Sequence, residues 1–120
     1  MTRRLMLSLA LGLTVTLSAT VFAHMKMAKS MPAADSTGAR PEKIQIWFSQ
    51  APDKAVSRIT LSGAAGEVKL GALAVGTDRS MSAAVEGAMA DGAYKVSWQA
   101  AGDDGHVQKG EYTFTVRQTR

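Results

Sequence analysis

Apolar and polar residues alternate along several short segments of this chain, most clearly over residues 42–49. Within this segment Ile44, Ile46 and Phe48 are two positions apart, and Trp47 falls on the opposite side with the polar residues. Side chains two positions apart point to the same face of a β-strand. The alternation, together with the β-branched and aromatic residues, predicts a half-buried strand.

The same pattern recurs between turn signals such as Asp91-Gly92. Further strands are predicted at residues 58–61, 67–70, 81–86, 93–100 and 110–116, with a short first strand within residues 24–41. Seven short strands without a convincing helix predict an all-β domain, a seven-stranded antiparallel β-sandwich. The main alternative is a helical turn over residues 83–90, because Ala and Met favour helix.

The first 23 residues differ from the rest of the chain. Arg3 and Arg4 form a short basic head, residues 5–21 are apolar apart from Ser and Thr, and residues 21–23 (VFA) place small residues as a signal-peptidase site requires. A transmembrane anchor is the alternative, since the apolar stretch is at the short end of what spans a bilayer. A cleavage motif followed at once by polar chain favours removal, so we predict a signal peptide at 1–23 and one exported domain at 24–120.

Composition narrows the possible functions. The chain of 120 residues has no cysteine, which excludes disulfides, thiol redox chemistry and thiolate metal sites. Removal of the two head arginines leaves 12 basic against 10 acidic residues, a formal charge of +2. These charges are scattered and not clustered beside aromatic residues, so a nucleic-acid partner is not expected.

The only two histidines of the chain stand at informative positions. His24 would be the first residue after cleavage, where its α-amine and imidazole Nδ1 can chelate one metal ion together. His106 lies in the loop before the last strand, two positions after Asp104, and in extended chain Asp104 rather than Asp103 points to the same side as His106. Three nitrogens and one oxygen form the tetragonal set that Cu(II) prefers. The sequence therefore predicts one Cu(II) per chain, held by His24, Asp104 and His106.

Each of these residues also has an ordinary explanation. A surface loop with Asp and His is common, Asp104-Gly105 can be simple turn chemistry, and His24 can be an accident of processing. The combination of both histidines with a carboxylate favours the metal site. Catalytic alternatives have less support, since neither a nucleophile elbow nor a phosphate-binding glycine loop is present.

Methionines are the second candidate ligands. Met25, Met27 and Met31 lie close to His24, and thioethers select Cu(I). The three methionines are also two or four positions apart, so in a first strand they would share one face. That face could be buried, because Met fills irregular core space. We favour packing, with a Cu(I) site as the alternative.

The chain resembles the CopC family of periplasmic copper-binding proteins over most of its mature length. The resemblance rests on His24 after a signal peptide, Lys29-Ser30-X-Pro32-Ala33, Pro41-Glu42-Lys43-Ile44-X-Ile46-X-Phe48-Ser49, Gly92-X-Tyr94-X-Val96-X-Trp98, Asp104-Gly105-His106, Gly110 and Phe114-X-Val116. It implies a Greek-key β-sandwich of cupredoxin-like, Ig-like topology that binds Cu(II) without oxidising a substrate. In the family the copper ligands are the N-terminal histidine and the Asp-X-His pair, which correspond here to His24, Asp104 and His106.

Three positions depart from the family pattern. Gln50 stands where many members have Glu near the copper, Val107 replaces a proline, and residues 62–80 lack the Met and His of a separate Cu(I) loop. The resemblance thus implies a Cu(II)-only protein of copper homeostasis or resistance, which gives copper to an inner-membrane transporter or another periplasmic copper protein. The alternatives are a histidine-brace redox enzyme and a metal-free Ig-like interaction module.

Overall fold

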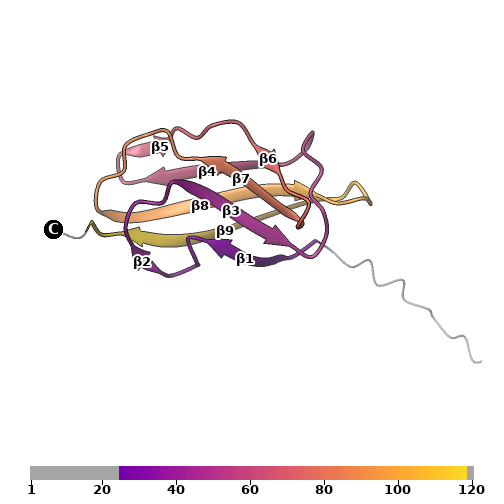
Figure 1. The fold of residues 1–120 in the computed structure, drawn as a ribbon, viewed down its shortest axis with the longest axis horizontal. Coiled ribbons are helices and arrows are strands. Elements are labelled where there is room, and N and C mark those ends of the chain that lie inside the picture. Colours follow the sequence, from indigo (N-terminus) through magenta and orange to yellow (C-terminus); the bar gives the residue numbers. More distant parts are fainter. Residues whose placement is uncertain (1–24, 119–120) are drawn as a thin grey trace, which may run out of the picture.

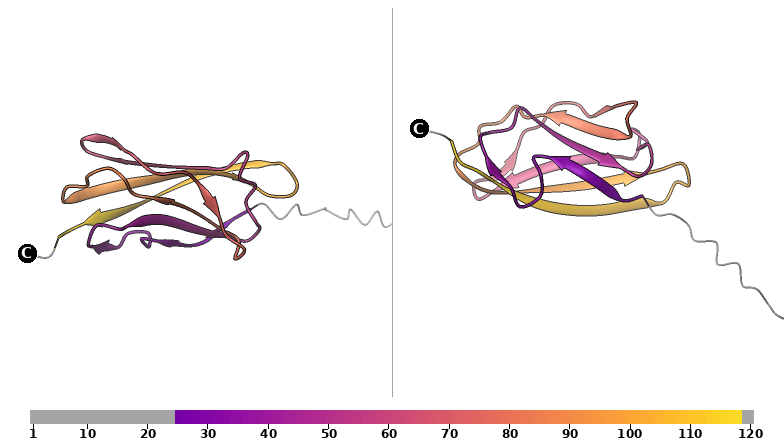
Figure 2. Two further views of the ribbon diagram at one scale, coloured as in Figure 1. Left: turned by 45° about the horizontal axis from the view of Figure 1, so that its top comes forward. Right: turned by 60° about the horizontal axis from the view of Figure 1, so that its bottom comes forward.

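A computed structural model describes residues 25–118, which form two β-sheets packed face to face (Figure 1). The first sheet has the strand order β1 (Met27–Met31), β3 (Lys43–Phe48), β7 (Ser80–Ala84) and β6 (Ala74–Val75). The second has the order β2 (Thr37–Gly38), β9 (Val107–Val116), β8 (Gly92–Ala101), β4 (Arg58–Gly63) and β5 (Gly66–Val68). Figure 2 shows the two sheets as separate layers.

The predicted all-β sandwich is confirmed, with nine strands in the described residues instead of seven. The two additional strands, β2 and β6, are two residues long, too short for an alternation to be visible in the sequence. All pairs are antiparallel except β2 with β9, which is parallel. The alternative helix at 83–90 is wrong, because residues 83 and 84 pair with β3 as the end of β7.

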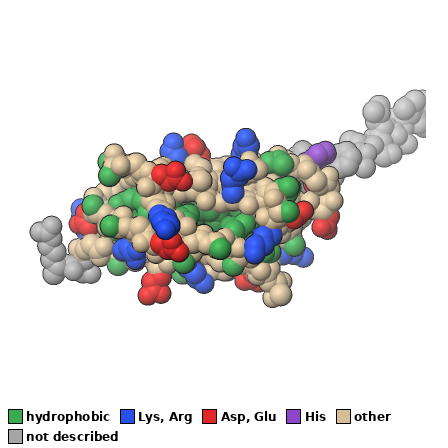
Figure 3. All heavy atoms as spheres, turned by 90° about the horizontal axis from the view of Figure 1, so that it is seen from above, with side chains coloured by type: hydrophobic (Ala, Val, Ile, Leu, Met, Phe, Trp, Pro, Cys, Tyr) green, Lys and Arg blue, Asp and Glu red, His purple; other side chains and the backbone are tan. Residues whose placement is uncertain are grey.

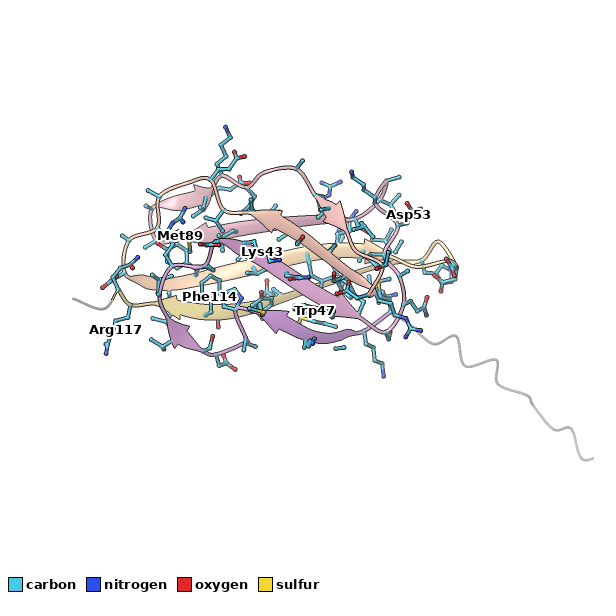
Figure 4. All side chains as sticks on the ribbon, viewed as in Figure 1. Lys43, Trp47, Asp53, Met89, Phe114 and Arg117 are labelled. Carbon is cyan, nitrogen blue, oxygen red and sulfur yellow. The ribbon has the colours of Figure 1, made fainter. Side chains whose placement is uncertain are left out.

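The core lies between the sheets and consists of the residues that the alternation placed on one face. Ile44, Ile46 and Phe48 are buried on β3, while Trp47 is only half-buried on the outer side. The alternating apolar residues of β8 and β9 are also buried: Tyr94, Val96, Trp98, Tyr112, Phe114 and Val116. Phe114, labelled in Figure 4, is one of these residues. Apolar burial of this kind is the main favourable term in folding, and here it acts without disulfides.

In the first strand, β1, the side chains do not alternate between the two faces as expected. Met27 pairs with Phe48 and Lys29 with Trp47, so β1 carries one extra residue between these two pairs, a β-bulge. Side chains beyond the bulge therefore change faces. Met27 packs against the core, but Met31 is 57% exposed. The expectation that all three methionines share one buried face is wrong for Met31.

The bulge also turns Ser30 toward the space between the sheets, close to Tyr112 of β9. The Ser30 hydroxyl donates to the Pro32 carbonyl at 2.9 Å, and the buried Tyr112 hydroxyl has no hydrogen-bond partner among the described residues. Burial, opposed by the nearby Ser30 hydroxyl, raises the pKa of Tyr112 from 10.0 to about 12. A buried phenol resists ionisation because the charged form loses its hydration.

This shifted pKa predicts a loss of stability in alkali. The unfolded chain releases the Tyr112 proton first, so the free energy of unfolding should fall as pH rises from about 10 toward 12. Urea titrations between pH 8 and 12 measure this decline, which should be smaller in Tyr112→Phe and retained in the control Tyr94→Phe. An equal decline in wild type and Tyr112→Phe would contradict the prediction.

Candidate metal centre

One end of the sandwich brings together the start of the described chain, the end of β3 and the loop between β8 and β9 (Figure 1). Lys26 donates its backbone N–H to the Ser49 hydroxyl at 2.9 Å, and the Ser49 N–H donates to the Lys26 carbonyl at 2.9 Å. Met25 is 5% exposed and belongs to the core. The chain is therefore held firmly at this end from residue 25 onward.

Gln50 connects this strand end to the β8–β9 loop. Gly102, the first residue of the loop, is buried, and a methyl group there would collide with the side-chain oxygen of Gln50. Because Gln50 directly follows Ser49, which is bonded to Lys26, the loop and the start of the described chain lie at the same end of the molecule. Gln50 stands out in the sequence as a departure from the family pattern, but its contact with Gly102 depends on tertiary structure.

The loop itself, residues 102–106, is a tight turn. The Gly105 N–H donates to the Gly102 carbonyl at 3.0 Å, and Gly105 has φ of 73°, a left-handed conformation that favours glycine. The Asp104 Oδ1 accepts the backbone N–H of His106 at 3.1 Å, and Asp104 Oδ2 lies 3.5 Å from His106 Nδ1. The imidazole is at the surface, with 60% of its side chain exposed (Figure 3).

The structure thus brings two of the three predicted ligands together. The cause differs from the one expected, because an Asp side chain that caps the N–H two residues later forms a local turn, whereas the prediction assumed extended chain. The third predicted ligand, His24, lies outside the described residues. Residues 25–118 contain no group of three His, Asp or Glu side chains placed to hold a metal ion.

The methionines of the described region mostly contribute to packing. Met25, Met81 and Met89 are buried in the core, and Met27 packs against it. Met31 is exposed on the far side of the bulge. This distribution favours the packing interpretation over a cluster of thioethers at the surface.

Trp98 lies on β8, close to the end that carries the Asp104–His106 loop, and its indole packs over a glycine in the neighbouring strand. Trp98 pairs with Gly110 of β9, and a Cβ at Gly110 would lie 2.6 Å from indole Cε2 and 2.9 Å from Nε1. On its other side the indole meets Phe48 edge-on, with ring centroids 5.0 Å apart at 70°. The indole is thus clamped between the two sheets, a reason for Gly110 that the sequence alone does not provide.

Comparison with known proteins identifies this architecture. The family model described as the CopC domain matches residues 27–117. The chain belongs to the CopC family.

Several relatives match along nearly their full length. The chain is 34% identical to Copper resistance protein C of Escherichia coli over 115 residues, which covers 88% of this chain and 91% of the relative. It is 31% identical to Copper resistance protein C of Pseudomonas syringae pv. tomato over 108 residues, 83% and 86% of the two chains. Protein YobA of Escherichia coli K12 is 30% identical over 119 residues, 96% of each chain.

Solved structures of the family share the fold. PcoC, a methionine-rich copper resistance protein from Escherichia coli, superimposes with a TM-score of 0.70 at 35% identity, covering 79% of this chain and 100% of PcoC. CopC from Methylosinus trichosporium OB3b gives a TM-score of 0.69 at 25% identity, covering 78% and 93%.

CopC membership makes this a copper-binding resistance protein without enzymatic activity, of a family that is periplasmic. It favours a copper-binding function over both the histidine-brace enzyme and the metal-free module considered above. Residues 25–118 contain no helix long and apolar enough to cross a bilayer.

The clamp on Trp98 predicts that Gly110→Ala is costly. The indole packs between Gly110 and Phe48, so overpacking should lower the free energy of unfolding by about 1–3 kcal/mol and alter the near-UV circular dichroism. Gly38→Ala is the matched control, because a Cβ there meets no atom within 4 Å. Equal stability of the two variants in urea titrations would show that Trp98 is not clamped in this way.

Proposed function

We propose that this protein is a periplasmic Cu(II) carrier or buffer whose site forms when the signal peptide is removed after Ala23. His24 would then supply the terminal amine and its imidazole, and Asp104 and His106 would supply a carboxylate and a second imidazole. The observation that carries the proposal is the Asp104–His106 pair, which stands at the same end of the sandwich as the anchored residue Met25.

The anchoring of Met25 supports a role for the residue before it. Consecutive Cα atoms are 3.8 Å apart, so a mature chain that begins at His24 begins within one residue of a fixed core position. A ligand held this way loses less conformational freedom on binding than one on a loose tail. Burial of Met25 and the two hydrogen bonds between Lys26 and Ser49 therefore favour an N-terminal chelate at this end.

The donor set of three nitrogens and one oxygen favours Cu(II) over the hard cations Mg²⁺ and Ca²⁺, which prefer oxygen. Thioethers would be needed to favour Cu(I), and only Met31 among the described methionines is exposed. Gln50, whose carboxamide contacts the loop at Gly102, would add no negative charge beside the site. A Cu(II)-only protein is the form of the proposal that these residues support.

Proton competition follows from the ligands. A terminal amine has an ordinary pKa of about 7.7–8.0 and must lose its proton to bind a metal. Cu(II) affinity should therefore weaken as pH falls, and steeply below about pH 6, where protons also compete for imidazole nitrogens. The bound copper would be passed to an inner-membrane transporter or to another periplasmic copper protein.

The decisive comparison is between protein that begins at His24 and the same protein with one added N-terminal residue. The added residue converts the α-amine of His24 into a peptide amide and so removes one of the proposed ligands. We therefore expect tight one-to-one Cu(II) binding to be lost. A chelator-competition titration with EPR measures both affinity and tetragonal geometry. Equal binding by the two forms would remove His24 from the site, and absence of binding by both would favour a metal-free module.

Asp104 and Asp103 provide a matched pair of variants. Asp104→Asn removes the carboxylate that lies 3.5 Å from His106 and should weaken Cu(II) binding by roughly tenfold or more. Asp103→Asn makes the same change of charge one residue away and should leave affinity within about twofold, since exposed charges interact weakly in water. Equal losses in the competition titration would mean that only the charge of the loop matters.

A further inference from the structure

Two exposed valines, Val56 and Val107, lie beside the loop that carries Asp104 and His106, and together they are called the apolar strip below. Val107 follows His106 directly and pairs with Ala101, the last residue of β8. On the opposite side of β8, the Asp53 N–H donates to the Ala101 carbonyl at 2.8 Å, and the Val56 carbonyl accepts from Gln99 Nε2 at 3.1 Å. Val56 and Val107 thus stand on either side of the end of β8.

These two valines are unusually exposed for their type. Val56 is 41% and Val107 46% exposed, and they are two of the three large hydrophobic residues exposed in the described part of the chain. Single exposed hydrophobic residues are ordinary, but two that flank one strand end beside the candidate metal loop suggest a contact surface. Figure 4 shows Asp53, which begins the turn containing Val56, at the end of the molecule where β8 and β9 meet.

A row of basic residues borders the apolar strip. Gln99 pairs with Arg58 on one side and Lys109 on the other, so both cations lie one step along the sheet from the valines. Among the described residues neither cation forms an ion pair, and Glu111, the one carboxylate on β9, lies 3.8 Å from Lys95. Two uncompensated positive charges beside an apolar strip form half of a typical interface, an apolar centre with a charged rim.

We infer that Val56, Val107, Arg58 and Lys109 form the docking surface for a copper-exchanging protein that presents an apolar patch rimmed by carboxylates. The inference rests on the proposed Cu(II) function and adds the surface and the chemistry of the partner. A protein docked on this surface lies directly beside His106, so its own ligands could reach the metal without long-range motion. The basic rim would steer an acidic partner and raise the association rate, an effect that falls with salt.

A protein partner fits this surface better than a membrane. Binding to a lipid interface draws on Trp, Phe and Leu inserted among the headgroups, whereas this surface offers two valines, Val56 in a turn and Val107 at the start of β9. The two cations are also few for lipid attraction, which is about 1 kcal/mol for each Lys or Arg. Anionic lipid remains an alternative for the experiment to exclude.

The test places a photo-crosslinking amino acid at Val107 in the full chain, expressed in cells of the source organism grown with copper. Ala93, exposed at the other end of β8, serves as the control position. We expect Val107 to give one cross-linked protein, identified by mass spectrometry as carrying an acidic surface, and Ala93 not to give it. The cross-link should be lost in Arg58→Glu/Lys109→Glu and retained in the control Lys43→Glu/Arg117→Glu, which makes the same change in net charge at distant exposed positions (Figure 4).

With the captured partner purified, the rate of Cu(II) transfer at low salt should fall by about tenfold or more in Arg58→Glu/Lys109→Glu, while Cu(II) affinity stays unchanged. Equal cross-linking at Val107 and Ala93, or insensitivity to the charge reversal, would overturn the inference. Charge-dependent sedimentation of the copper-loaded protein with phosphatidylglycerol-containing vesicles, without a protein cross-link, would overturn it in favour of lipid. Failure of the wild type to bind Cu(II) would instead reject the proposed function on which the inference rests.

Discussion

The antiparallel pairing of β8 with β9 is the constraint on which the rest of the structure depends. Both strands are ten residues long and pair along their whole length, from Gly92 with Val116 to Ala101 with Val107. This register places the aromatic residues of both strands in the core and closes the hairpin with five residues. Because a slip of one residue would turn every side chain to the opposite face, the position of the Asp104–His106 turn is fixed by the packing of the whole hairpin.

The end of the sandwich at this turn is assembled from segments far apart in the sequence. Hydrogen bonds between Lys26 and Ser49, the contact of Gln50 with Gly102, and the bond from Asp53 to Ala101 join three of them. Each contact is small, and together they hold the loop against a core that has no disulfides to support it. In the proposed function, this scaffold brings the start of the mature chain to a carboxylate and an imidazole that are already in place.

Metal binding and partner docking would share one hairpin end in this arrangement. Asp104 and His106 occupy the turn, and Val107 and Lys109 continue from it along the outer face of β9. Neighbouring positions for the two roles would let a carrier release copper only to a protein that fits the adjacent surface. The opposite end of the sandwich, where Met89 and Arg117 lie (Figure 4), has no such pairing of ligands with an exposed strip in the described residues.

The sequence by itself determined the sandwich class, the core faces of β3, β8 and β9, and the candidate ligands. These features are local, because alternation follows from the geometry of a single strand and ligand chemistry from residue type. Only the tertiary structure decided which way Met31 points, since the bulge is visible only in the register of β1 against β3. The same holds for Gly110 beneath Trp98, Gln50 against Gly102, and the strip formed by Val56 and Val107. Each of these depends on a partner from a distant part of the chain, and the relative placement of strands is set by packing between sheets, which no local pattern records.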